Sequence, residues 1–223
     1  IGPMYPPVKK HIASILDLNY IGHKQYMAKF RRLSLSLFIP LMAKRADHII
    51  TISEFSKNDI HKYLNIPLSK ITVTHLAGRP KTEIDNVLLK EVLQQYGIKK
   101  KYIVSFSSTQ LHKNIERLIK AFAQIKDEIG YDLVLVGYLP AGSTWDQLIN
   151  AENLKKRIII TGFVPHGHVM PLLSGAKLFV FPSLYEGFGL PLLDAQSAGV
   201  PVISSNAGSL PEVGGVKVTY FDP

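Results

Sequence analysis

The chain has 223 residues, of which 46% are apolar, and can therefore bury the core of one large domain or two small ones. It contains no cysteine, which excludes disulfide bonds and thiolate metal sites and favours the cytoplasm over an oxidising compartment. The most apolar segment, LSLSLFIPLMA at 33–43, is interrupted by Pro40 and is too short to span a bilayer. The opening IGPMYPPVKK lacks the pattern of a signal peptide and indicates an internal cut.

The formal net charge of +9 is concentrated in the first third of the chain. Residues 1–77 hold 11 Lys and Arg against 4 Asp and Glu, whereas residues 78–223 hold 15 against 13. The segment 23–48 predicts one or two helices with basic ends, and such a patch suits nucleic acid, an anionic lipid surface, an anionic sugar or simply solvent. Because KH and RRM motifs are absent, we expect no nucleic acid partner. Peripheral contact with an anionic membrane, at its inner face, is the hypothesis for Lys29, Arg31 and Arg32.

Short apolar runs alternate with helical patterns along the chain, which is typical of an α/β protein with a mostly parallel sheet. The predicted strands are residues 12–16, 48–52, 70–74, 102–107, 132–137, 157–162, 177–182, 200–205 and 216–221. Several of them are apolar at nearly every position, as expected for strands buried on both faces. Segment 114–129 predicts a helix with one core-facing stripe, formed by Ile115, Leu118, Ile119, Phe122 and Ile125.

A domain boundary is predicted after the strand at 70–74. The segment HLAGRPKTEID, residues 75–85, combines glycine, proline and mixed charge, which is typical of a hinge. We predict a partial N-terminal Rossmann-like domain at 1–77, a hinge and connecting helix at 78–100, and a nucleotide-binding Rossmann-like domain at 101–223. The first part lacks the opening strands of an α/β domain, so we interpret it as the tail of a longer domain.

The segment KLFVFPSLYEGFGLPLLDAQSAG, residues 177–199, predicts a strand, a loop and a helix that begins near Leu190. Pro191 suits the first helical position, and Gly199 suits the helix end. Gly187 and Gly189 allow the backbone to approach a ligand closely. The amides there and in the first helical turn favour a phosphate.

Two acids surround this predicted phosphate cradle. Glu186 lies in the loop, whereas Asp194 lies about one turn into the helix with its side chain directed back toward the helix start. We expect both to accept hydrogen bonds from hydroxyls of one polyol phosphate. An acid early in a helix can also be ordinary complementation of the helix dipole, and this alternative stays open.

Three long stretches resemble one family. FPSLYEGFGLPLLDAQSAGVPVISSNAGSLPEVGG at 181–215 resembles the signature of the retaining nucleotide-sugar glycosyltransferases of family four, the group 1 transferases, whose motif is two acids separated by seven residues. Residues 45–73 and 102–123 are similar to the end of the family's first domain and the start of its second. The resemblance implies the GT-B fold of two facing Rossmann-like domains. It further implies metal-independent transfer of a sugar from a nucleoside-diphosphate sugar to a carbohydrate or lipid-linked acceptor, without a cofactor, in polysaccharide biosynthesis.

The resemblance also implies roles for single residues. Glu186 would contact the hydroxyls of the transferred sugar, Asp194 would hold the ribose, and Lys113 would neutralise the diphosphate. Lys113 suits this role on physical grounds because HKN begins a helix, where a cation and helical amides can share one anion, although a solvated lysine is the alternative. Ser108 and His112, near the lysine, would be further donor-binding residues. Backbone groups near Gly162, Phe163 and Val164 would pair with the base of the nucleotide. The donor-binding residues of the cradle would be Gly187, Phe188, Gly189 and Leu190.

The sequence departs from the family pattern at several of these positions. Ser108 and His112 stand where members often place an arginine, and Asp194 replaces the second glutamate. Leu16, before Asp17, replaces a histidine that reaches the donor sugar. Two hypotheses therefore remain: a glycosyltransferase, or a fragment or degenerate relative that binds nucleotide sugar without transferring it.

A few polar residues have local interpretations. Ser53 is predicted to be the N-cap of a helix at 54–64, and Tyr185 is predicted to pack beside the cradle. His75, near the hinge, can be structural or functional. His166 and His168 lack a third ligand, so the sequence indicates no zinc site there, and no DxD pair occurs elsewhere.

Overall fold

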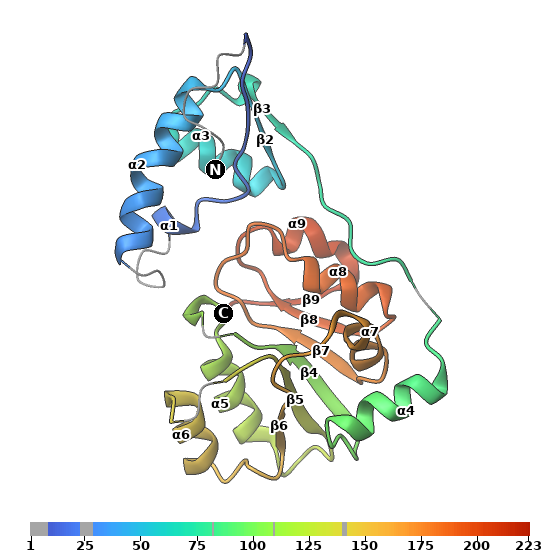
Figure 1. Ribbon diagram of the computed structural model, residues 1–223. Helices are drawn as coiled ribbons and strands as arrows, with labels where there is room; N and C mark the ends of the chain where they lie inside the picture. The colour runs from blue at the N-terminus through green and yellow to red at the C-terminus, as the bar shows by residue number, and fades with distance from the viewer. Residues whose placement is uncertain (1–8, 23–28, 82, 109, 140–141) are drawn as a thin grey trace.

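The computed structural model describes residues 9–22, 29–81, 83–108, 110–139 and 142–223. It contains two parallel sheets, a three-stranded sheet of order β1-β2-β3 and a six-stranded sheet of order β6-β5-β4-β7-β8-β9. We call the three-stranded sheet with its helices the first unit, and the six-stranded sheet with its helices the second unit. A long extended connector, of which residues 74–81 and 83–85 are described, joins them (Figure 1). The predicted α/β class is thus confirmed.

The first unit consists of short strands and three helices. Its strands are β1 (Ile12–Ser14), β2 (His48–Thr51) and β3 (Ile71–Val73), and its helices are α1 (Asn19–Gly22), α2 (Lys29–Arg45) and α3 (Glu54–Leu64). The predicted basic helical segment corresponds to α2, which contains Pro40, while residues 23–28 lie outside the described residues. No helix in the described part of the chain has both the length and the apolar character that a membrane span requires.

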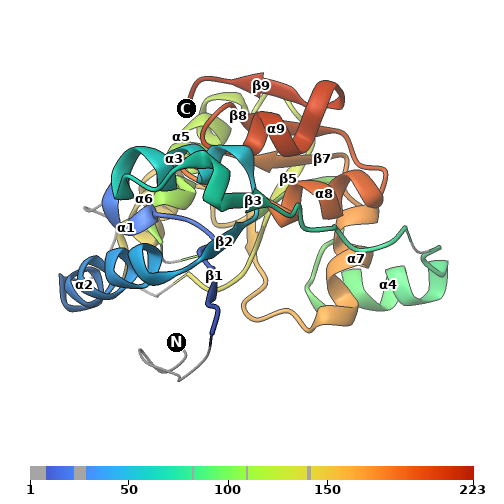
Figure 2. The same cartoon turned by 90° about the horizontal axis from the view of Figure 1, so that it is seen from above.

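Helix α3 begins where the sequence predicts. Ser53 is extended, with φ −151°, and its hydroxyl accepts a hydrogen bond from the backbone N–H of Ser56 at 3.0 Å. This bond satisfies one of the amides that the first helical turn leaves without a partner. Ile60 and Leu64 face the core of the first unit. Seen from above, α3 lies closer than α2 to helix α9 (Leu210–Gly214) of the second unit (Figure 2).

The second unit places helices on both faces of its sheet. Its strands are β4 (Tyr102–Phe106), β5 (Asp132–Val136), β6 (Ile158–Ile160), β7 (Leu178–Phe181), β8 (Val202–Ser205) and β9 (Thr219–Phe221). With α9, its helices are α4 (Asn86–Gln95), α5 (Ile115–Ile125), α6 (Thr144–Ala151), α7 (His166–Ser174) and α8 (Leu190–Ser197). Val104 and Val134 pack toward α4, α7 and α8, whereas the alternate residues Ile103 and Leu133 pack toward α5 and α6. The sheet is therefore buried on both faces, as its apolar strands predict.

Several elements are shorter than predicted; β1, for example, ends at Ser14 and not at residue 16. Ile125 was assigned to the core stripe of its helix, but it is 40% exposed because it is the last residue of α5 and the chain turns away after it. The final strand was predicted at 216–221 but covers only Thr219–Phe221, since Gly215–Lys217 forms a 3-10 turn. The predicted domain limits at 77 and 100 fall between the two sheets and stay a prediction.

Candidate functional site

The segment after β7 folds as the sequence predicts. A loop follows the strand, and α8 begins at Leu190 with Pro191 in its first turn. Gly189 precedes the helix with φ +103°, a backbone conformation that residues with a Cβ rarely adopt. Gly199, with φ +75°, follows the helix end. The carboxyl end of β7 and the amino end of α8 therefore meet at Glu186 and its neighbours.

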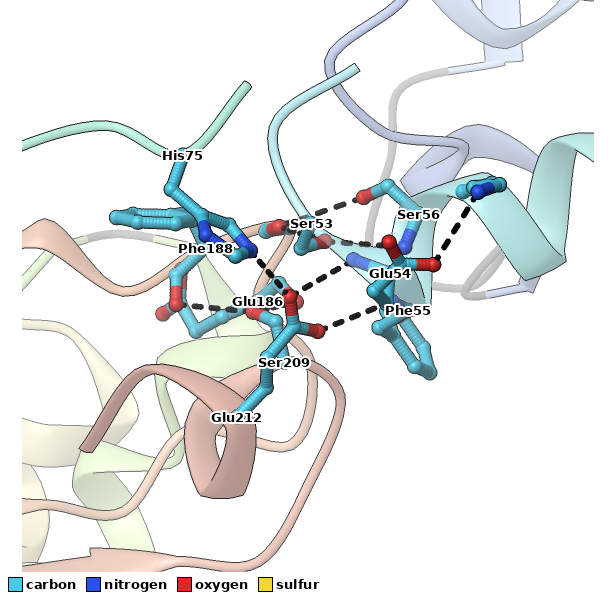
Figure 3. Close-up of polar contacts among 11 residues, drawn as sticks. Ser53, Glu54, Phe55, Ser56, His75, Glu186, Phe188, Ser209 and Glu212 are labelled. Carbon is cyan, nitrogen blue, oxygen red and sulfur yellow. Dashed lines mark hydrogen bonds and ion pairs between the residues drawn. The ribbon is translucent and has the colours of Figure 1, made fainter. Parts of the chain in front are cut away.

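The second unit holds the backbone of this loop through the segment before α9 (Figure 3). The Ser209 hydroxyl donates to the carbonyl oxygens of Glu186, at 3.0 Å, and Phe188, at 2.9 Å. Gly208 lies so close that a Cβ there would come within 2.7 Å of the Glu186 carbonyl oxygen. The position of Glu186 is consequently fixed by the segment before α9.

The first unit holds the loop from the other side. The Ser53 hydroxyl donates to the carbonyl oxygen of Gly187 at 2.7 Å. A Cβ on Gly187 would lie 2.7 Å from the Cβ of Asp17. The space over this glycine is thus taken by the first unit, although we expected Gly187 to admit a ligand.

Tyr185 joins the two units beside Glu186. Its hydroxyl donates to the Asp59 carboxylate at 3.4 Å and accepts the backbone N–H of Leu18 at 3.4 Å. Burial, followed by the charges of Asp17 and Asp59, raises the pKa of Tyr185 well above its usual range. The side chain is 4% exposed and its ring contacts Phe55, so the predicted packing position is confirmed.

The structure brings together the two residues predicted to be catalytic. Lys113 ends a 3-10 turn, and its Nζ lies 2.6 Å from Oε1 of Glu186. The two side chains are 20% and 13% exposed, so this ion pair is largely shielded from water. The turn and the loop are also joined by a 2.7 Å hydrogen bond from the Leu184 N–H to the His112 carbonyl oxygen.

The ion pair lies in a cleft of about 400 Å³ that both units line. The second unit contributes polar groups, among them Lys113, His112 and Glu186. The first unit contributes the polar residues Asp17, Asn19 and Tyr20 and an apolar wall of Ile15, Leu16, Leu35, Ile39 and Met42. The cleft can therefore offer hydrogen bonds to a polyol on one side and apolar contact on the other.

Asp194 lies in a second pocket of about 500 Å³, together with Leu190 and Pro191. Its carboxylate is 7% exposed and is held by Arg79 of the connector, through the backbone N–H at 2.8 Å and through the guanidinium. The Arg79 Nε also donates to Nε2 of His166 at 3.1 Å. The two acids line different cavities in this structure, so their action on one ligand stays a prediction.

The other predicted donor-binding residues are more dispersed. The Ser108 hydroxyl accepts the N–H of Gln110 at 3.1 Å and so supports the turn that carries Lys113. Gly162 has φ +68°, Phe163 is 86% exposed, and Val164 packs partly against the core. These four residues lie outside the described lining of both cavities.

Phe188, another predicted cradle residue, is also buried and packs against the connector. It is 5% exposed, and its ring centre lies 6.0 Å from that of His75. Among the described residues, no three His, Asp or Glu side chains lie close enough together to hold a metal ion.

A comparison with protein families identifies the chain. The model described as "Glycosyl transferases group 1" matches residues 90–219, which is more than half of the sequence. The chain belongs to the group 1 glycosyltransferases. The match includes Lys113, Glu186 and Asp194, so the family resemblance noted from the sequence is confirmed.

Two named enzymes are similar over much of the chain. "O-antigen chain mannosyltransferase B" of Escherichia coli is 32% identical over 97% of this chain and 58% of its own length. "N-acetyl-alpha-D-glucosaminyl L-malate synthase" of Bacillus anthracis is 30% identical over 65% of this chain and 41% of its own length. The chain thus spans about half the length of these relatives.

Solved structures share the fold of this group 1 glycosyltransferase. Anabaena Alr3699/HepE, solved with UDP and glucose, superposes with a TM-score of 0.76 at 20% identity, covering 96% of this chain and 58% of HepE. WaaG, described as a glycosyltransferase involved in lipopolysaccharide biosynthesis, superposes with a TM-score of 0.75 at 16% identity. This match covers 97% of this chain and 65% of WaaG. The likeness confirms the GT-B arrangement of two parallel-sheet units.

Proposed function

We propose that the chain carries the donor site of a retaining, metal-independent glycosyl transfer. A sugar would move from a nucleoside-diphosphate sugar to a carbohydrate or lipid-linked acceptor in the cleft between the units. The observation that carries the proposal is the shielded Lys113–Glu186 pair, which faces a cleft lined by both units. Mannosyltransferases among the relatives and a neighbour solved with UDP and glucose support this substrate class.

The charges of the site suit the departure of a diphosphate. As the bond between sugar and phosphate breaks, negative charge grows on the leaving oxygen, and Lys113 with the amides at the start of α8 would stabilise it. Glu186, released from Lys113 by the phosphates, would accept hydrogen bonds from sugar hydroxyls. Asp194 would hold the ribose with the carboxylate lone pairs that Arg79 leaves available.

The second candidate function is binding without transfer. Leu16 lies in the cleft, 54% exposed, at the position where the family resemblance places a histidine that reaches the sugar. Leu16 therefore supplies no imidazole to the cleft.

A donor assay separates the two functions. Sugars linked to UDP, GDP and ADP would be incubated with the protein, and release of nucleoside diphosphate would be followed with and without oligosaccharide acceptors. We expect release with at least one donor and its loss in Glu186→Gln. The exposed Glu91 of α4 offers a matched control, Glu91→Gln, which should retain release. Binding of a donor without release would support the second function, and absence of any binding would refute both.

Helix α2 supports a peripheral membrane contact, which we propose as part of the same function. Phe30 is 86% exposed, Leu33 60% and Leu37 56%, and Lys29 and Arg32 lie on the same helix. The side chain of Arg31 lies outside the described residues. Exposed apolar residues beside cations suit an anionic lipid surface, and so would place the protein at the inner face of the membrane.

Vesicle sedimentation tests this contact. Binding should rise with the phosphatidylglycerol content of phosphatidylcholine vesicles and fall with salt. Arg32→Glu should weaken it, whereas Lys120→Glu on α5, which is also exposed, should not. Equal binding to neutral and anionic vesicles would show that these cations are ordinary solvated surface.

A further inference from the structure

Glu212 forms a helix cap across the two units. This residue lies on α9, and its Oε1 accepts the backbone N–H of Glu54 at 2.8 Å while its Oε2 accepts that of Phe55 at 3.1 Å (Figure 3). These amides begin α3, where helical N–H groups lack partners within the helix. The carboxylate also complements the positive end of the helix dipole. A side chain of the second unit thus completes the start of a helix in the first unit.

The same carboxylate contacts the connector. Nε2 of His75 lies 2.8 Å from Oε1 of Glu212, and the two side chains are 58% and 24% exposed. His75 also packs on Phe188 of the Glu186 loop. Glu212 therefore joins three segments, namely α3, the connector and α9.

Helix α9 links this cap to the backbone of Glu186. Ser209, three residues before Glu212, donates to the carbonyl oxygens of Glu186 and Phe188. Ser53, at the N-cap of α3, donates to the carbonyl oxygen of Gly187 in the same loop. The Ser56 hydroxyl, in the first turn of α3, donates to the same oxygen at 3.3 Å. The start of α3 and the Glu186 loop are consequently connected directly, through Ser53 and Ser56, and also through α9.

We propose that Glu212 is a positioning residue that aligns the first unit with the Glu186 loop. It lies outside the described lining of the donor cleft and acts through α3 and Ser209. Its effect on transfer rests on the proposed function, because only a site built from both units requires this alignment. Loss of Glu212 would let the units separate and move the first-unit wall of the cleft away from Lys113 and Glu186.

A distance measurement tests the alignment without any substrate. The chain contains no cysteine, so spin labels can be placed specifically at Lys62→Cys on α3 and Lys120→Cys on α5. Pulsed electron resonance should give one narrow distance distribution for the parent and a broader, longer one for Glu212→Ala. Glu91→Ala, the control, should match the parent. An unchanged distribution in Glu212→Ala would overturn the proposal.

Kinetics then separate positioning from general stability. In Glu212→Ala we expect kcat to fall about tenfold to a hundredfold, since small misplacements of reacting groups have such effects. Donor KM and the affinity for UDP or GDP should change less than about threefold, because the nucleotide contacts stay in the second unit. Glu212→Asp, which retains the charge, should partly restore kcat. Equal loss of kcat and nucleotide affinity would overturn the proposal.

The two proposals fail in different ways. If the parent neither binds nor transfers a nucleotide sugar, the proposed function is wrong, and the distance distributions still decide whether Glu212 aligns the units. If transfer occurs and Glu212→Ala leaves both kcat and the distances unchanged, only the positioning role is refuted.

Discussion

Replacement of Lys113 by methionine tests how the protein holds a diphosphate. The substitution retains most of the side-chain length and removes the charge that lies 2.6 Å from Glu186. A hydrogen bond to a charged group contributes roughly 1.5 to 3 kcal/mol, so loss of the phosphate contact alone would weaken binding about tenfold to 150-fold. In the unbound protein, however, Lys113 is already paired with Glu186, and a diphosphate must compete with that carboxylate. We therefore expect a loss near the lower limit of that range, about tenfold.

A double-mutant cycle measures this competition. Glu186→Gln should bind the bare nucleoside diphosphate as tightly as the parent or a few times more tightly, because Lys113 no longer has an anionic partner. In the Glu186→Gln background, Lys113→Met should reduce the binding free energy of the diphosphate by more than it does in the parent. The reduction should approach the full value of about 1.5 to 3 kcal/mol.

Isothermal titration calorimetry with UDP and GDP provides the affinities. Lys120→Met, on the exposed face of α5, is the matched control and should bind like the parent. Equal affinities of Lys113→Met and the parent for every diphosphate that binds would refute the assignment of Lys113 to the phosphates.

Three further predictions concern stability, measured by urea unfolding. Arg79→Ala should lower the free energy of unfolding by about 1 to 3 kcal/mol, because the carboxylate of Asp194 loses its guanidinium partner, and Asp194→Asn in that background should recover part of the loss. Tyr20→Phe should leave stability unchanged or higher at neutral pH, because the buried hydroxyl has no hydrogen-bond partner among the residues that the structure describes. Burial raises the pKa of Tyr20 to about 12, so the parent should lose stability as the pH rises from about 10 toward 12, and Tyr20→Phe should lose less. Ser53→Ala should lower the free energy of unfolding by about 1 kcal/mol, because the N-cap of α3 is lost. An unchanged urea midpoint would contradict the cap.

Much of the fold could be predicted because its signals are local. Strand β5, for example, is buried at all five positions and appears in the sequence as a run of four apolar residues after Asp132. The start of α3 follows from Ser53, and the start of α8 follows from Gly189 and from Pro191 two positions later. Each of these features depends on residues within one turn or one strand.

The contacts across the units could not be predicted in this way. Arg79 and Asp194 are 115 residues apart, and Glu212 and Phe55 are 157 apart. No periodicity relates such residues, and each of these charged residues is compatible with an exposed position. Gly187 is a similar case. Its sequence context predicts that another group lies close to its backbone, but it does not predict that this group is Asp17.

The central claim is that Glu186 acts on the sugar and Asp194 on the nucleotide. It is tested most directly by calorimetry with one nucleoside diphosphate and the corresponding nucleotide sugar, on the parent, Glu186→Gln and Asp194→Asn. We expect Glu186→Gln to weaken the nucleotide sugar while the bare nucleotide binds at least as tightly as in the parent. Asp194→Asn should weaken both ligands equally. If Glu186→Gln weakened the bare nucleotide as much as the nucleotide sugar, the placement of the two acids would be wrong.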